Sequence, residues 1–161
     1  MYYWILQHNP QLLPENIPWP AGISPNRDYW HISRYDEEIR IDDIAFIWHA
    51  GTNRGIYNMA IIVSTPPHNT EAERQITILQ ENDNPYWTDN ERRRKLRHHP
   101  AILIENQYTD GLRPPILFQE LCDQGFNNLP VLQMPQRGIY RLEDEVGAQL
   151  RDYITRTRPL P

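Results

Sequence analysis

A tryptophan stands among polar residues in one short segment, where it could bind a ligand. Trp30, Ser33, Arg34 and Tyr35 fall within six residues. An indole face suits stacking of a planar apolar ligand, and a hydroxyl or guanidinium group can read the edge of that ligand. Trp30 is flanked by polar residues rather than by an apolar run, so we predict a binding role for it.

Two further aromatic residues flank an expected hairpin turn. Trp48 precedes and Tyr57 follows the turn at 50–54, whose Gly51 and Asn53 suit a tight reversal. If the flanking segments pair, Trp48 and Tyr57 lie toward the same end of a sheet. They could then border the same ligand, although core packing explains each of them equally well.

One dense positive run could contact phosphates. It lies at 92–99 and contains Arg92, Arg93, Arg94, Lys95 and Arg97. Such a run commonly forms the solvated face of a helix. Trp87 lies close by, however, and basic side chains near aromatic rings suit single-stranded or flipped nucleotides. Both interpretations stay open.

The sequence lacks the patterns that common enzyme chemistries require. His98 and His99 are adjacent and cannot chelate as histidines four apart on a helix do, and HExxH and CxxC motifs are absent. No serine lies in a G-x-S-x-G turn, and the loop at 51–55 lacks the Lys-Ser/Thr of a phosphate loop. We therefore expect no catalytic residues, no metal and no cofactor.

Hydrophobic periodicity predicts an α+β domain built around a curled sheet. The predicted strands cover 2–7, 44–49, 55–64 and 101–108, and order resumes at 29–35 after a proline-rich loop at 8–25. The predicted helices cover 89–96, 116–122 and 143–155. The segment 69–84 is ambiguous between a loop and a short strand at 75–79.

Length and composition indicate one domain, residues 1–161, in a reducing cytoplasm. The chain has one cysteine and no apolar run as long as the roughly 18 to 20 residues of a membrane span. The net charge of −5 argues against a general coat for nucleic acid. Fifteen of the 16 basic residues are arginine, which suits stacking and forked contacts with phosphates or base edges.

Several short motifs resemble one known family and occur in its order along the whole chain. They are the segments 1–7, 30–35, 43–51, 55–57, 84–87 and 129–138, the last followed by Tyr140-Arg-Leu142. Together these segments resemble the EVE domain of the PUA-like superfamily, which is related to YTH and ASCH domains. The resemblance implies a curled mixed sheet, or pseudo-barrel, flanked by short helices.

The resemblance also implies a function and a set of site residues. Similar domains recognise modified bases in DNA or RNA, frequently 5-methylcytosine, and often accompany modification-dependent restriction enzymes. By this resemblance Trp30 forms the stacking wall, Ser33 reads the edge of the base, and Arg34 and Tyr35 line the rim. The remaining residues implied by the resemblance are Trp48, Ala50 and Gly51 on the opposite side, Tyr57 behind them, and Trp87.

Three functional hypotheses follow from the sequence. The first is a non-enzymatic reader that stacks a flipped or unpaired modified base, with a nuclease encoded nearby or fused as its partner and no membrane. The second is a sensor of small molecules or nucleotides, or a hydrolase, that uses the same pocket. The third is an interaction domain whose aromatic residues all pack in the core.

Overall fold

A computed structural model describes residues 1–14, 17–34, 37–133 and 138–160. The strands are β1 (Tyr3–His8), β2 (Arg27–His31), β3 (Ile44–His49), β4 (Gly55–Ser64), β5 (Ala101–Asn106), β6 (Ile116–Leu117) and β7 (Ile139–Leu142). The helices are α1 (Thr70–Asp83), the 3-10 helix η1 (Asn84–Tyr86), α2 (Asn90–Arg97), α3 (Phe118–Asp123), α4 (Pro130–Gln133) and α5 (Asp144–Thr157). None of the described helices is long and apolar enough to cross a membrane.

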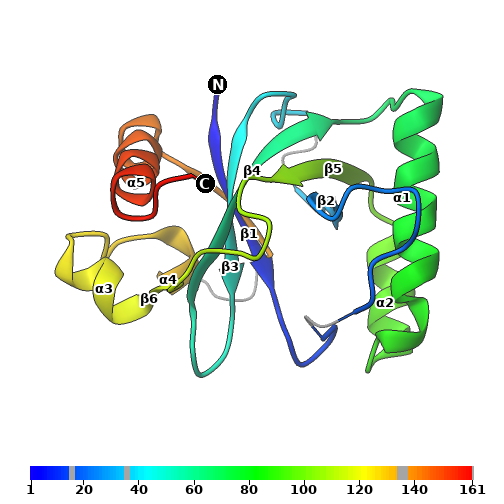
Figure 1. The fold of residues 1–161 in the computed structure, drawn as a ribbon, viewed down its shortest axis with the longest axis horizontal. Helices are drawn as coiled ribbons and strands as arrows, with labels where there is room; N and C mark the ends of the chain where they lie inside the picture. Colours follow the sequence, from blue (N-terminus) through cyan, green and yellow to red (C-terminus); the bar gives the residue numbers. More distant parts are fainter. Residues whose placement is uncertain (15–16, 35–36, 134–137, 161) are drawn as a thin grey trace.

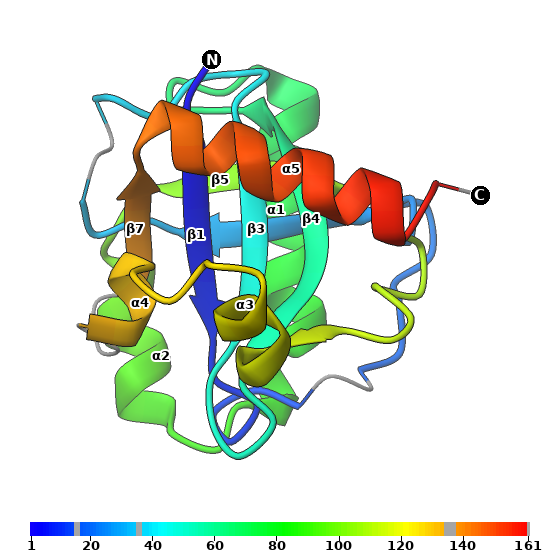
Figure 2. The ribbon, with the colours of Figure 1, turned by 90° about the vertical axis from the view of Figure 1, so that its left-hand side faces the viewer.

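The described strands form one mixed, strongly bent sheet. Its order is β2-β5-β4-β3-β1-β7, with β6 paired to β4, and the sheet is not closed. Strand β1 runs parallel to β3, whereas the other paired strands are antiparallel. The ten-residue β4 pairs with β3 through its first part and with β5 through its last part. Figures 1 and 2 show that β2 and β5 consequently run across the direction of β1 and β3.

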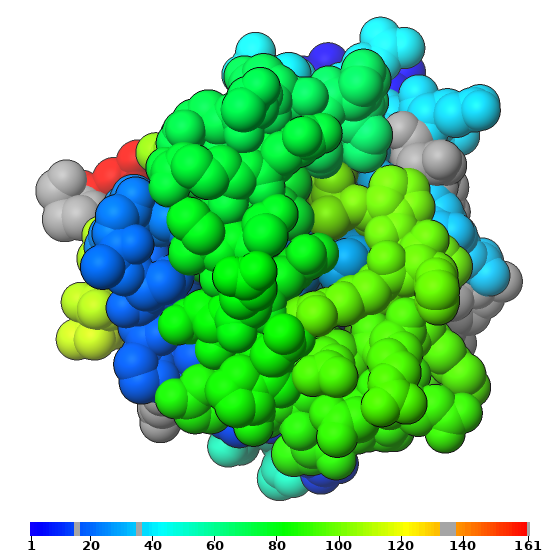
Figure 3. All heavy atoms as spheres, turned by 90° about the vertical axis from the view of Figure 1, so that its right-hand side faces the viewer, coloured from blue at the N-terminus to red at the C-terminus, as the bar shows by residue number. Residues whose placement is uncertain are grey.

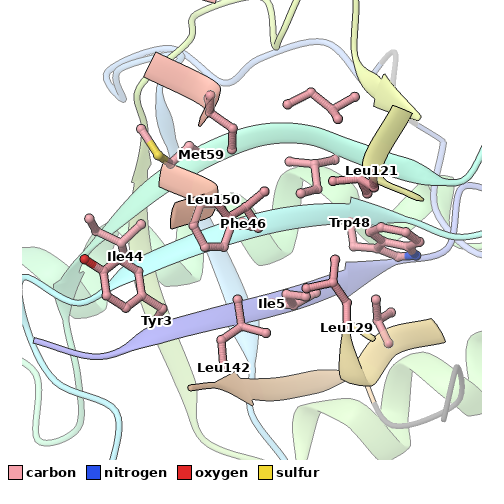
Figure 4. Packing of buried hydrophobic residues seen from close by; sticks show 14 of the residues in the cluster. Tyr3, Ile5, Ile44, Phe46, Trp48, Met59, Leu121, Leu129, Leu142 and Leu150 are labelled. Carbon is pink, nitrogen blue, oxygen red and sulfur yellow. The ribbon is translucent and has the colours of Figure 1, made fainter. Parts of the chain in front are cut away.

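Alternation along β1 and β3 divides the core between the two faces of the sheet. Tyr3, Ile5, Phe46 and Trp48 belong to a cluster with Leu150 and Ile154 of α5 (Figure 4). The residues that alternate with them along the two strands point to the other face and belong to a second cluster. This cluster includes Trp4, Leu6, Ala45 and Ile47, together with Ile102 and Ile104 of β5. Helices α1 and α2 lie on the opposite side of the molecule from α3 and α5 (Figure 1). Strands β2 and β5 curl over the face of the sheet that carries the second cluster.

The segment 69–84, left open between a strand and a loop, forms a helix. Asn69 is its N-cap, and the Asn69 Oδ1 atom accepts a hydrogen bond from the Ala72 amide at 2.8 Å. The buried residues of α1 are Ala72, Ile76, Leu79 and Asp83. This spacing of three and four residues is typical of a helix face. Neither alternative, the loop or the short strand at 75–79, was correct, because the buried residues follow the period of a helix rather than the alternation of a strand.

Most other predicted elements are present, with shifted ends. The hairpin strands 44–49 and 55–64 match β3 and β4, and the helices predicted at 89–96 and 143–155 correspond to α2 and α5. The segment predicted as a helix at 116–122 begins instead as β6, because Ile56 and Gly55 of β4 pair with Ile116 and Leu117. The helix starts only at Phe118.

Candidate nucleobase-binding site

The concave face of the sheet borders a cavity of about 970 Å³. Its walls come from the ends of β1 and β3, from β2 and β5, from α1 and α2, and from the loop that follows β1. A cavity of this volume can hold a small planar ligand. Figure 3 views the molecule from the side of α1 and α2 and shows a hollow between the green α1 and the yellow-green segment that includes α2.

Trp30 lines this cavity as the sequence predicted. It lies on β2 opposite Ile102 of β5, is partly buried, and packs against the second core cluster. The ring of His8 meets the Trp30 indole edge-on, with 6.2 Å between the ring centroids. The core therefore supports one part of the indole, and the rest is accessible from the cavity.

Of the other residues predicted in the Trp30 segment, only one of those that the structure describes lines the cavity. Ser33 lines the cavity, whereas Arg34 is exposed and is not among the lining residues. Tyr35 lies outside the described residues. Trp87, predicted from a different segment, lines the cavity, and its indole N–H donates a hydrogen bond to Asp83 Oδ1 at 3.2 Å. Trp30, Ser33 and Trp87 are thus brought to one cavity.

Trp48 does not face this cavity. Its side chain is only 2% exposed and packs on the α5 side of the sheet near Leu121 (Figure 4). Successive residues of a strand point to opposite faces, so Ile47 and His49 occupy the cavity side of β3. The expectation that Trp48 forms a pocket wall was therefore wrong, since proximity to the turn does not determine which face a side chain occupies.

The hairpin turn contributes to the site indirectly. Ala50, Gly51 and Tyr57 are not among the residues that line the cavity, which corrects the expected opposite wall. Tyr57 lies behind a lining residue: its ring stacks on His49, with centroids 3.9 Å apart and an interplanar angle of 13°. The Tyr57 hydroxyl donates a hydrogen bond to the Asn53 carbonyl at 2.6 Å, which fixes the ring against the turn.

The basic run divides into two groups with different surroundings. Arg92 and Lys95 line the cavity, and Arg94 is exposed. Arg93 and Arg97 instead tie α2 to the end of α1: Arg93 donates to the Asn84 carbonyl at 3.3 Å, and Arg97 donates to the Gln80 carbonyl at 2.8 Å. Only part of the predicted phosphate-binding run is therefore available to a ligand.

A buried polar cluster, which the sequence analysis missed, holds β2 against α1 and α2. The Tyr29 hydroxyl donates a hydrogen bond to Asp83, and Arg97 lies 3.5 Å from the same carboxylate. Burial raises the pKa of Asp83, and burial beside Asp83 raises the pKa of Tyr29. The regular helical spacing of Asp83 with Ile76 and Leu79 could have indicated that this aspartate is buried.

A second missed residue, Asp28, lies in the cavity wall. Burial is the main cause that raises the pKa of Asp28 to about 7, and the nearby Asp83 adds to the effect. The backbone N–H of Tyr29, which donates to Asp28 Oδ1 at 2.8 Å, acts in the opposite direction. Asp28 stands two residues before Trp30, and this spacing on a strand was the available indication that they share a face.

Two histidines that line the cavity, His31 and His49, are mostly neutral at physiological pH. Burial lowers the pKa of His49 to about 4 and lowers that of His31. Within the part of the chain that the structure describes, no group of three or more His, Cys, Asp or Glu side chains is arranged to hold a metal ion. The cavity thus combines aromatic faces with a few hydrogen-bonding groups.

Comparison with solved structures identifies the fold. Human THYN1 protein in complex with 5-methylcytosine-containing DNA is similar over 100% of this chain and 99% of its own, with 13% identity and a TM-score of 0.57. A hypothetical protein from Leishmania major gives 14% identity and a TM-score of 0.56 over 98% of both chains. A mutant ASCH protein from Zymomonas mobilis gives 11% identity and a TM-score of 0.51, over 94% of this chain and 98% of its own.

The chain has the same overall fold as these solved structures. The expected fold class, a curled mixed sheet with short flanking helices, is confirmed, and the sheet remains open rather than forming a closed barrel. No family model matches the sequence, and no curated protein matches it either. At these sequence identities, the likeness to the solved structures concerns the fold alone.

The raised pKa of Asp28, a half-buried side chain in the cavity wall, makes the stability of the domain pH-dependent. A carboxyl group with a raised pKa stabilises the fold while it is protonated, and this contribution is lost as the pH rises from about 4 to about 7. Asp28→Asn is expected to stabilise the protein by about 1 to 4 kcal/mol at pH 8 and to have little effect at pH 4. Chemical denaturation at both pH values measures this difference, and an equal effect at both would contradict it.

Proposed function

We propose that this domain is a non-enzymatic reader of a modified nucleobase, 5-methylcytosine or a related base in DNA or RNA. The base would be flipped or unpaired and would stack on Trp30. The observation that carries the proposal is the partly buried indole of Trp30 in the wall of a cavity of about 970 Å³. The similar fold of human THYN1, whose structure contains 5-methylcytosine DNA, supports it.

The energies of such binding are consistent with a recruiting module. Extrusion of a base from a duplex costs a few kcal/mol, and stacking on an aromatic side chain contributes about 1 to 3 kcal/mol. Burial of one methyl group adds roughly 0.8 kcal/mol, so methyl contact alone provides modest selectivity. We therefore infer that the domain, as a single unit over 1–161 in the cytoplasm, acts with a partner such as a nuclease encoded nearby or fused to it.

Replacement of the stacking residue tests the proposal. Trp30→Ala is expected to weaken binding to an oligonucleotide with one central 5-methylcytosine by about 1 to 3 kcal/mol, because the base loses its aromatic support. Titration by fluorescence anisotropy measures this change. The matched control is Tyr2→Ala, which removes an aromatic ring that lies beside Arg141 rather than in the cavity.

The control should bind as the unmodified protein does, and both variants should retain their cooperative thermal unfolding. Wild-type protein that binds neither modified nor unmodified oligonucleotides would refute the proposal. So would binding that does not change when Trp30 is replaced.

Two basic residues of α2 are expected to bind the nucleic-acid backbone. Arg92 and Lys95 line the cavity, so their joint replacement by alanine should reduce the slope of log affinity against log salt by roughly 1.4 to 1.8. The relative affinities for modified and unmodified bases should not change, because phosphate contacts carry no base information. Binding titrations at several salt concentrations measure the slope.

The control for this experiment is Arg113→Ala, which removes an exposed charge outside the cavity. This variant should keep the slope of the unmodified protein. An unchanged slope after replacement of Arg92 and Lys95 would contradict the predicted phosphate contacts. It would favour the interpretation that the run forms a solvated helix face.

A second candidate function, a nucleotide-sensing or hydrolytic domain with the same cavity, is favoured by one observation. The pKa of Asp28, raised to about 7, is suited to a general base at neutral pH. Such a domain should bind free nucleotides or convert them, and mass spectrometry of nucleosides and oligonucleotides after incubation detects conversion. Products that disappear in Asp28→Asn would favour this function over the reader, whereas unchanged substrates would favour the reader.

A further inference from the structure

Asp28 and Trp30 lie on the same face of β2 and line the same cavity. Side chains two residues apart on a strand share a face and are separated by roughly 6.6 Å along it. The β5 residues opposite them, Ile104 and Ile102, belong to the core cluster of the concave face. A planar ring stacked on the indole of Trp30 would therefore place one edge close to the carboxyl group of Asp28.

Among the polar groups of this face, Asp28 has hydrogen-bonding capacity left. The Asp28 Oδ1 atom accepts from the Tyr29 amide, whereas Oδ2 makes no hydrogen bond with any described residue. Asn58 also lines the cavity, but its amide group is engaged with the backbone of Met59 and Tyr108. Of these two groups, only the Asp28 carboxyl can thus bind a ligand without losing an existing partner.

A neighbouring asparagine extends the same polar strip. Asn106 lines the cavity on β5, and its backbone N–H donates to the Asn26 carbonyl at 2.7 Å. The side-chain oxygen of Asn106 is buried and has no hydrogen-bond partner within the described residues. A buried acceptor without a partner is costly, so a ligand that donates to it would relieve this cost.

We propose that Asp28 reads the edge of the base stacked on Trp30 and selects a base that presents an amino group beside an unprotonated ring nitrogen, as 5-methylcytosine does. This inference rests on the proposed function and identifies the class of base. The Tyr29 amide fixes Oδ1 as an acceptor, which leaves Oδ2 to carry the proton and act as a donor. In the same orientation, thymine would place its carbonyl oxygen against the acceptor Oδ1 and its ring N–H against the donor Oδ2–H. Neither pair could form a hydrogen bond.

The electrostatics of the cavity support this pairing. Because burial raises the pKa of Asp28 to about 7, a large share of the molecules carry the required proton at neutral pH. The preference should therefore weaken as the pH rises above about 7. The other charged or titratable groups that line the cavity are His8 of β1, Tyr29 and His31 of β2, His49 of β3, Asp83 of α1, Arg92 and Lys95 of α2, and His99.

A comparison of two oligonucleotides tests Asp28 separately from stacking. Single strands that differ only in a central 5-methylcytosine or thymine share the methyl group and differ in the edge. The wild-type protein is expected to prefer 5-methylcytosine by about tenfold at pH 6.5 and by less at pH 8.5. Asp28→Ala should abolish the preference while binding remains sensitive to Trp30.

Asp28→Asn provides the decisive second variant. An asparagine presents the same acceptor and donor as a protonated aspartate, without titration, so this variant should keep the preference at both pH values. Any pH dependence that remains in it comes from the histidines or other groups. Asp152→Asn, an exposed change on α5, is the matched control and should behave as the wild type.

Three results would overturn the inference. Equal affinity of the wild-type protein for the two strands would do so, as would a preference that survives in Asp28→Ala. A wild-type preference that grows with rising pH would also contradict it. Failure of the proposed function is distinguishable, because then neither strand binds, or Trp30→Ala binds as tightly as the wild type.

Discussion

The bend in β4 is the constraint on which the cavity beside Trp30 depends. This strand pairs with β3 through residues 55–61 and with β5 through residues 60–64, and a register shift separates Ile62 from Ser64. A bulge of this kind increases local twist and turns the strand. The bend carries β5, and with it the edge strand β2, over the concave face of the sheet. The indole of Trp30 consequently faces the ends of β1 and β3 instead of solvent alone.

Alternation of side chains then decides which residues can meet a ligand. On β2, Asp28 and Trp30 share the concave face, whereas Tyr29 borders the cavity from the other face of the strand and packs in the cluster that includes Ile76 and Leu79 of α1. On β3 the same rule assigns Ile47 and His49 to the cavity and Trp48 to the core beneath α5. The two tryptophans therefore have different environments: Trp48 is buried in the core and Trp30 is exposed to the cavity.

Local patterns in the sequence were sufficient for the hairpin and for the last helix, but not for the cavity. The β3–β4 pairing follows from Gly51 and Asn53, which are close in sequence to both strands. The pairing of Tyr29 with Leu103 joins distant segments, and no local pattern encodes it. For this reason the accessible position of Trp30 could be predicted from its polar neighbours, whereas the residues of α1 and α2 that share its cavity could not. The buried carboxyl group of Asp83 likewise acquires its role only when Tyr29 and Arg97 reach it.

The distribution of charge follows from the same architecture and bears on how the domain could bind nucleic acid. Arg93 and Arg97 are used to hold α2 against α1, and the chain as a whole has a net charge of −5. Counterion release scales with the number of phosphates that basic residues neutralise, so few free cations give weak non-specific binding. Under the proposed function, affinity would come mainly from the cavity, where stacking and edge contacts would act on a single base. The proposed function therefore requires this acidic domain to discriminate between bases rather than to coat a strand.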